Sequence, residues 1–193
     1  MTRKRLDMFV FLSAAALLGV LFGTLIYCYA GDATREMLTN IREDFLESRL
    51  GCDFGTMLIK SFGTGLLFML AVYLLGLCAL GQPFTVLVLI YRAVGIGTAA
   101  ASIFSVYGKE GIRVFSFLLL PEGAAGLMIL ILLCRESITM SGIVFKTLTA
   151  DTGGRHLPDI TKLYSVKALI LLSCMGAAAL LQSLLVTAYR ALA

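Results

Sequence analysis

The sequence predicts an all-α protein, a polytopic transmembrane helix bundle of about five spans with one or two interfacial amphipathic helices. Three observations support this: 59% of the 193 residues are hydrophobic, 15% are charged, and the mean hydropathy is +0.93. Soluble domains are about 45–50% apolar and about 25% charged. A water-soluble fold of this size could not bury so much apolar surface, so the lipid bilayer must be part of the solvent. We treat residues 1–193 as a single integral membrane domain.

Five apolar runs are long enough to cross a bilayer, because a helix needs about 20 residues to span the hydrocarbon core of ~30 Å. The runs are residues 8–30, 58–80, 84–107, 112–134 and 163–189. The first follows a basic cluster, as in a signal peptide. Its length exceeds the roughly 7–15 apolar residues of a secretory signal, so we expect an uncleaved span.

Two longer connections remain between these spans. Residues 31–57 are polar, with apolar side chains at steps of mostly three and four, which is the period of an amphipathic helix. We expect this segment on the outer membrane surface or over the bundle. Residues 135–162 are predicted to be a cytoplasmic connection, and their first part, SITMSGIVFKTL, is a candidate second interfacial helix.

Lysine and arginine positions indicate the orientation, because they are enriched in cytoplasmic loops. With a cytoplasmic N-terminus, the inner segments hold Arg3, Lys4, Arg5, Arg135, Lys146, Arg155, Lys162 and Lys167. The inner segments hold only slightly more lysine and arginine than the outer segments. The N-terminal basic cluster therefore decides the orientation, since the charges around the first helix usually dominate it. We expect the N-terminus inside and the C-terminus outside. The net charge of +4 is explained by these anchoring residues and does not indicate a nucleic-acid partner.

Two charged residues fall within predicted spans, Arg92 in the third and Glu122 in the fourth. A charge near the bilayer centre costs roughly 2.5–3.5 kcal/mol on insertion scales and should face protein or water. At 1.5 Å per residue, the two lie about 13 Å and about 18 Å from the inner ends of their spans. The spans are adjacent and antiparallel, so an Arg92–Glu122 ion pair is our hypothesis. Fixing helix register, conduction or proton coupling, and snorkelling of Arg92 away from Glu122 remain alternative roles.

Proline and glycine residues mark further candidate positions. Pro121 removes a helix hydrogen bond and Gly123 weakens the same region, which predicts a kinked or broken fourth helix. Small residues let membrane helices approach closely. The candidate packing glycines are Gly19, Gly23, Gly95 and Gly97. They favour a compact bundle and allow contacts with a partner or a second copy in a homo-oligomer.

No motif for catalysis, metal binding or cofactor binding is evident. The single histidine, His156, lies in the cytoplasmic connection, and HExxH and GxxxxGK[ST] patterns are absent. The five cysteines are widely spaced without a CxxC pair. Acidic residues in 31–57 alternate with arginines, as on a solvated helix face. We therefore predict that the protein is not an enzyme and has no cofactor.

The order of several local patterns is similar to that of a known family. LLGVLFG in the first span is followed by a polar segment, KSFGTGLLFML, the GQP turn, YRAVGIG, FSFLLLPEGAAGLM and RESITMSG. This layout resembles the stage II sporulation protein M family of bacterial membrane proteins, over most of the chain. Glu122 stands where that family often has another polar residue after its leucine–proline step. The family's later acidic position has no counterpart in AAGLMIL.

The resemblance implies a multi-pass protein of the bacterial cytoplasmic membrane that acts in engulfment during sporulation. It implies a non-enzymatic scaffold that anchors peptidoglycan-degrading partners, the stage II sporulation proteins D and P, at the septal membrane. Cell wall remodelling would be the work of those partners. The alternative is a small transporter component, either an importer's substrate-binding subunit or a permease, which should show a polar pocket with several convergent groups. An intramembrane enzyme ranks last.

Overall fold

The computed structural model describes residues 2–31, 54–108, 111–116, 120–149 and 157–192, together with Thr34, Met37 and Asn40. Its helices are α1 (Thr2–Tyr29), α3 (Phe54–Leu77), α4 (Gly81–Tyr107), α5 (Gly111–Val114), α6 (Leu120–Thr149) and α7 (Leu157–Leu192). The described ranges contain no strand. Among the described residues, five of these helices, all but α5, are long and apolar enough to cross a membrane. The predicted all-α transmembrane bundle is confirmed, and the chain is a multi-pass membrane protein.

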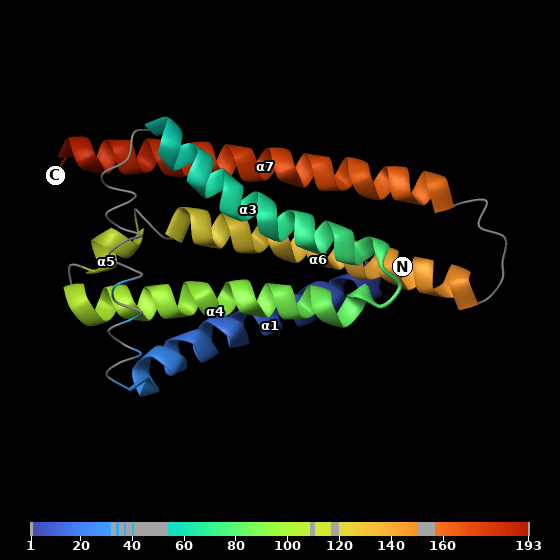
Figure 1. Cartoon of the computed structure of the whole chain (residues 1–193), viewed down its shortest axis with the longest axis horizontal. Coiled ribbons are helices and arrows are strands. Elements are labelled where there is room, and N and C mark those ends of the chain that lie inside the picture. The colour runs from blue at the N-terminus through green and yellow to red at the C-terminus, as the bar shows by residue number, and fades with distance from the viewer. Residues whose placement is uncertain are drawn as a thin grey trace.

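The long helices lie roughly along one axis and alternate in direction with the chain (Figure 1). α1, α4 and α7 run one way, and α3 and α6 run the other. The N-terminus and the C-terminus therefore lie at opposite ends of the bundle. We call the end where α1, α4 and α7 begin the proximal end, and the other the distal end.

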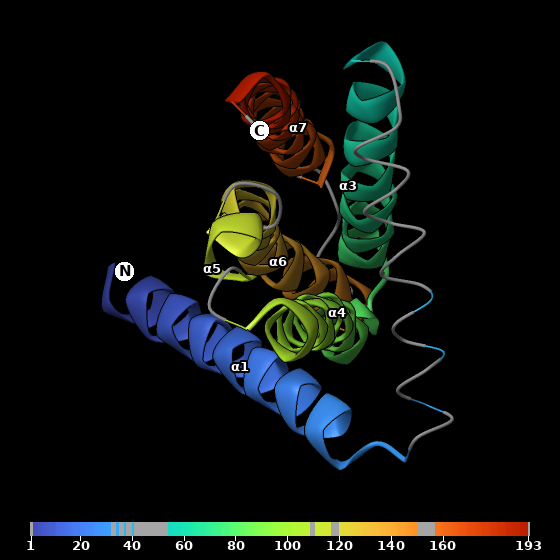
Figure 2. The ribbon, with the colours of Figure 1, turned by 90° about the vertical axis from the view of Figure 1, so that its left-hand side faces the viewer.

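Helix α6 occupies the centre of the bundle. Figure 2 shows α3, α4 and α7 around it, with α1 against α4, and α6 contacts all four of the other long helices. Its buried side chains include Ile129, Leu130, Leu133 and Cys134, which form the main apolar core with residues of the surrounding helices. A helix that is buried on several sides needs apolar residues around most of its circumference, and this stretch supplies them.

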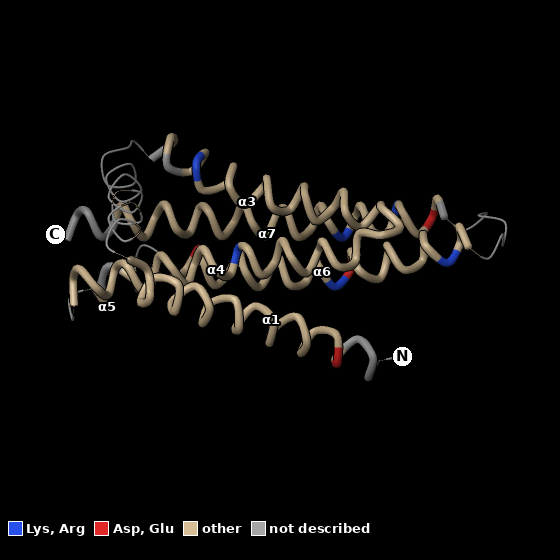
Figure 3. Tube along the Cα trace, turned by 60° about the horizontal axis from the view of Figure 1, so that its bottom comes forward, with Lys and Arg blue, Asp and Glu red and all other residues tan. Residues whose placement is uncertain are grey.

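The outside of the bundle is also apolar. Leu17 is 67% exposed, Leu67 is 68% exposed and Leu169 is 65% exposed, although leucine usually lies inside a soluble protein. Charged positions are few along the helices (Figure 3). Such a surface matches the bilayer interior, where helices satisfy their own backbone hydrogen bonds and present apolar side chains to lipid.

The fourth span differs from the prediction at both ends. We predicted one helix over 112–134 followed by a connection over 135–162, whereas α6 begins at Leu120 and continues to Thr149. The candidate interfacial helix SITMSGIVFKTL is the last part of α6. The connection between the fourth and fifth spans is therefore shorter than predicted, residues 150–156, because α7 begins at Leu157. The predicted boundary relied on Arg135 and Glu136, whose charges are paired within the bundle.

The two prolines near span ends lie in first turns of helices. Pro121 is the second residue of α6, and Pro83 is the third residue of α4. The first N–H groups of a helix have no intrahelical partner, so proline costs no hydrogen bond there. In the described residues the span predicted over 112–134 divides into α5 and α6, with Pro121 in the first turn of α6. The kinked or broken fourth helix at Pro121 and Gly123 stays a prediction.

Most of the polar segment 31–57 lies outside the described residues, so its predicted amphipathic helix stays a prediction. The described part resumes at Phe54, where α3 begins. The remaining spans agree with the predicted runs to within a few residues, with α3, α4 and α7 covering 58–80, 84–107 and 163–189 almost completely.

Candidate functional site

Glycines join α1 to α4. A Cβ atom at Gly19 would lie 2.8 Å from Ala93 Cβ, and one at Gly23 would overlap the carbonyl oxygen of Val94. On the facing helix, a Cβ at Gly97 would overlap the carbonyl oxygen of Val20. Glycine therefore permits a backbone approach that no other residue allows. Three of the four predicted packing glycines lie at this interface.

Gly95 does not belong to the α1–α4 interface. It is exposed, and a Cβ there would meet no described atom within 4 Å. Residues two apart on a helix point to nearly opposite sides. The Gly95–Gly97 pair therefore cannot serve one interface, and the role of Gly95 as a packing residue stays a prediction.

A second set of contacts links α3, α4, α6 and α7 near the proximal end. We call it the hydroxyl cluster, and its members are Tyr73, Thr85, Ser137, Ser141, Tyr164 and Ser165. Ser137 Oγ donates to the carbonyl oxygen of Val72 at 3.0 Å and lies 3.3 Å from Thr85 Oγ1. One turn later, Ser141 Oγ donates to the carbonyl oxygen of Cys78 at 2.8 Å, just after α3 ends. Serines four residues apart share a helix face, so α6 holds the end of α3 at two points.

The tyrosines of the hydroxyl cluster connect α3 to α7. The rings of Tyr73 and Tyr164 are stacked, with centroids 5.1 Å apart and planes inclined by 3°. Tyr164 Oη donates to the carbonyl oxygen of Tyr73 at 3.2 Å, and Tyr73 Oη lies 2.8 Å from Ser165 Oγ. Gly76 leaves room for this arrangement, since a Cβ there would overlap Tyr164 Oη. Buried hydroxyls here are satisfied by groups of the protein itself, as a low-dielectric environment requires.

An ion-pair group lies beside the hydroxyl cluster. Glu136 Oε1 is 2.8 Å from Arg135 Nη2, and Glu136 Oε2 is 2.7 Å from Lys167 Nζ. Lys167 belongs to α7, so the carboxylate joins α6 to α7. Charges at membrane depth are expected to pair with one another, and this group satisfies that expectation.

Arg92 and Glu122 both interact with α3. Ser61 Oγ donates to Glu122 Oε2 at 3.2 Å, and the Arg92 guanidinium carbon lies 5.0 Å from the centre of the Phe68 ring, within cation–π range. α4 and α6 are adjacent here, because a Cβ at Gly123 would lie 3.8 Å from Ile96 Cδ1. An ion pair between Arg92 and Glu122 stays a prediction.

A charge exchange tests the Arg92–Glu122 pair. Arg92→Glu and Glu122→Arg should each lower the yield of folded protein in membranes, because each places like charges together at membrane depth. The double reversal should restore most of the yield, measured with the melting temperature after extraction into detergent. Lys146→Glu, at the exposed proximal end of α6, is the control and should change little. A double variant no better than the worse single variant would contradict the pair.

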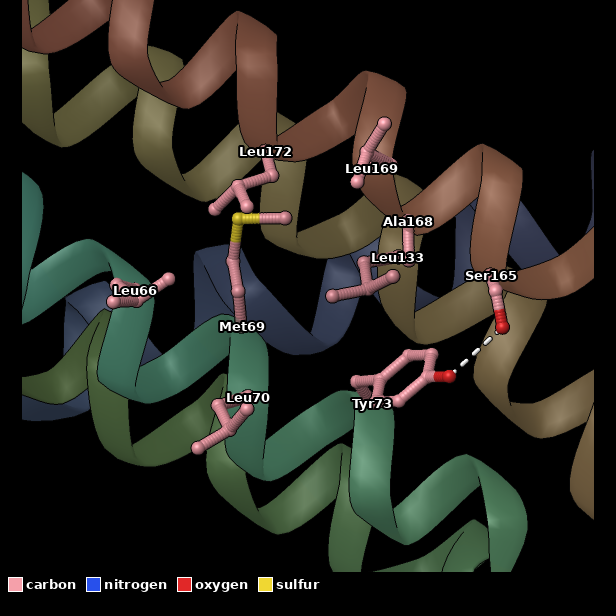
Figure 4. Close-up of a pocket in the computed structure, with 9 residues that line it drawn as sticks. All are labelled: Leu66, Met69, Leu70, Tyr73, Leu133, Ser165, Ala168, Leu169 and Leu172. Atoms are coloured by element: carbon pink, nitrogen blue, oxygen red, sulfur yellow. Dashed lines mark hydrogen bonds between the residues drawn. The ribbon is translucent and has the colours of Figure 1, made fainter.

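An apolar cavity of about 250 Å³ lies between α3 and α7 (Figure 4). Most of its lining is leucine, together with Met69 and Ala168, and its polar groups are Tyr73 and Ser165. Those two hydroxyls are hydrogen-bonded to each other. The cavity therefore offers shape and apolar surface, not convergent polar groups for a water-soluble ligand.

Sequence reasoning did not find the hydroxyl cluster or the Glu136 group. Ser137 and Ser141 belong to the predicted interfacial helix SITMSGIVFKTL, and their spacing of four indicates a polar face there but not a place inside the bundle. The approach of Tyr73, Tyr164 and Lys167 depends on the tertiary arrangement of α3 and α7. His156 lies outside the described residues. Within the described ranges, no group of three histidine, cysteine or acidic residues is arranged to hold a metal ion.

The described residues form five long apolar helices that pack closely against one another, and this places the chain in the class of multi-pass membrane proteins. No family model, curated protein or solved structure matches the chain.

Proposed function

We propose that this protein is a non-enzymatic membrane scaffold that anchors peptidoglycan-remodelling partners at the septal membrane during engulfment. The specific role comes from the resemblance to the stage II sporulation protein M family. The structural observation that supports a scaffold is that hydroxyl groups buried between the helices are already hydrogen-bonded within the protein. Where α3, α4, α6 and α7 meet, the described hydroxyl groups bond to backbone carbonyls and to one another.

A bundle whose buried hydroxyl groups are already hydrogen-bonded to one another and to backbone carbonyls suits a protein that holds others in place. A binding subunit of an importer should present several unoccupied polar groups around a ligand-sized cavity. The cavity between α3 and α7 is apolar, and Tyr73 and Ser165 close its polar end. Rigid helices with apolar outer faces can contact transmembrane segments of partners through close packing. These features favour the scaffold over the transport alternative.

Affinity isolation tests the proposed role. The full chain with an affinity tag, extracted in mild detergent from membranes of sporulating cells, should enrich the stage II sporulation proteins D and P, detected by mass spectrometry. The reason is that a scaffold must form complexes that survive extraction. A tagged multi-pass protein of unrelated function from the same membrane is the control. Recovery of neither hydrolase above this control would argue against the proposal, and recovery of an ATP-binding cassette subunit would favour transport.

We also propose that the N-terminus faces the cytoplasm of a bacterial cell and the C-terminus faces outside. The support is the basic cluster before α1 together with the location of the two termini at opposite ends of the bundle. A reporter enzyme that is active only outside the cytoplasmic membrane should be active when fused after Ala193. The same reporter fused before the first residue is the control and should be inactive. The reverse pattern would overturn the orientation.

A further inference from the structure

The cavity between α3 and α7 opens toward the lipid-facing side of the bundle. Leu70 and Leu169 on its walls are 54% and 65% exposed, while Leu133 of α6 forms its buried floor. Figure 4 shows these side chains around a space that lies along the two helices. We call this feature the α3–α7 slot. In a bilayer, an open apolar depression is in contact with acyl chains or with another transmembrane segment.

Contacts at both ends of the α3–α7 slot hold α3 and α7 too close for a helix to lie between them. α3 and α7 contact each other on both sides of it, through Tyr73 and Tyr164 at the proximal side and through Gly65 and Met175 at the distal side. The tyrosine centroids are 5.1 Å apart, and a Cβ at Gly65 would lie 2.8 Å from Met175 Cε. A helix with side chains is about 10–12 Å wide, so it cannot enter between them. The slot accepts a slender apolar chain.

The α7 lining of the slot, from Ser165 to Leu172, is about 10 Å long at 1.5 Å per residue, and the turn of α7 before it, which carries Lys162, completes the depth of one leaflet. From Lys162 to Leu172, α7 rises about 15 Å at 1.5 Å per residue, which is half of a hydrocarbon core of ~30 Å. Tyr73 lies beside Tyr164 and Ser165, and α3 ends one turn later at Leu77, so Lys162 lies level with the end of that span. A chain in the slot would therefore lie between the Tyr73–Ser165 hydrogen bond and about the bilayer centre, and its part nearer the membrane surface would run outside that bond toward Lys162.

An exposed lysine lies beyond the polar end of the slot. Ser165 Oγ donates to the carbonyl oxygen of Thr161 at 3.0 Å and lies 2.8 Å from Tyr73 Oη, so these hydroxyls are satisfied. The exposed Lys162 lies on the same face of α7, three residues before Ser165 and seven residues before Leu169. A lysine at the membrane surface attracts lipid phosphate.

We propose that the α3–α7 slot binds one acyl chain of a phospholipid from the leaflet at the proximal end, with Lys162 holding the lipid phosphate. This lipid site does not depend on the scaffold role, because it rests on the shape and lining of the slot and needs no partner protein. A lipid held here fills space that would otherwise weaken the contact between α3 and α7, and it makes the bundle sensitive to the composition of that leaflet.

Photolabelling of the intact protein tests the site. The full chain in maltoside micelles receives a small fraction of phosphatidylglycerol with a diazirine in one tail, and labelled peptides are mapped after irradiation. Detergent competes for the general surface, so peptides of residues 66–73 and 165–172 should be labelled about fivefold more than the face around Leu184, an exposed leucine of the same helix. Equal labelling of both regions would overturn the proposal.

Matched variants separate the acyl chain from the headgroup. Leu169→Trp should fill the slot and reduce its labelling about threefold or more, while Leu184→Trp, at a similarly exposed position, should not. Lys162→Gln should lower labelling to the value given by diacylglycerol with the same tails, while Lys146→Gln should not. Equal labelling by diacylglycerol and phospholipid would overturn the role of Lys162. If the slot peptides lost their label because a second copy of the chain covered them, the lipid would be overturned as the occupant of the slot.

Discussion

Gly97→Leu should separate α1 from α4 and destabilise the protein by about 3 kcal/mol or more, at the upper end of the cost of overpacking. The reason is that a Cβ at Gly97 would overlap the carbonyl oxygen of Val20, and a Cβ at Gly23 would overlap that of Val94. Backbone atoms cannot rotate aside as a side chain can, so the two helices must move apart. The Tyr27–Ser105 hydrogen bond, 2.7 Å long, would be lost with them. Thermal unfolding in detergent measures the effect.

The control for Gly97→Leu lies two residues away on the same helix. Gly95→Leu adds the same side chain where a Cβ meets no described atom within 4 Å. It carries the same change in helix propensity and hydrophobicity, so the difference between the two variants isolates the α1–α4 contact. Similar melting temperatures for both variants would show that the close approach of α1 and α4 contributes little to stability.

Glu136→Gln should destabilise the protein more than Lys167→Gln. Glu136, whose side chain is 16% exposed, accepts hydrogen bonds from both Arg135 and Lys167. Without its charge, two cations are left together beside the hydroxyl cluster. Without the charge of Lys167, Glu136 still has Arg135. We expect a loss of about 2 kcal/mol for Glu136→Gln and less than about 1 kcal/mol for Lys167→Gln, between the values for exposed and buried pairs because Lys167 is 37% exposed.

The double variant and a distant control complete this test. Glu136→Gln with Lys167→Gln should be more stable than Glu136→Gln alone, because only one cation then lacks its partner. Lys146→Gln, an exposed residue near the end of α6, should leave the melting temperature nearly unchanged. The interaction is measured as a double-mutant cycle from unfolding in detergent. Equal losses for the two single variants would rule out the asymmetry that the geometry predicts.

Hydropathy predicts the spans well because lipid imposes a single requirement on every surface that it touches. It does not mark the end of a helix where charges are paired, and α6 continues past Arg135 and Glu136 for that reason. Gly19, Gly23 and Gly97 are predictable because a close helix approach needs small residues. The exposed position of Gly95 is not predictable from the sequence, since the direction in which a glycine of α4 points depends on which side of α4 meets α1.

The hydroxyl cluster could be predicted only in part. The spacing of Ser137 and Ser141 indicates one polar face on α6, but a sequence does not say which carbonyl groups that face will meet. Val72 and Cys78 supply them because α3 passes beside α6 in the opposite direction. The same limit applies to Glu122, whose hydrogen bond from Ser61 joins residues of helices that are not adjacent in the chain.

The central place of α6 has a consequence for biosynthesis. Helices enter the membrane in the order in which they are translated, and α6 is the fourth of the five long helices to emerge. Before it arrives, α4 has α1 and α3 as neighbours, and the serines that hold the end of α3 are not yet present. α1, α3 and α4 therefore lack their shared central neighbour until the second half of the protein follows. Completion of the bundle is a late event, set by the ribosome's passage through the codons of α6 and α7.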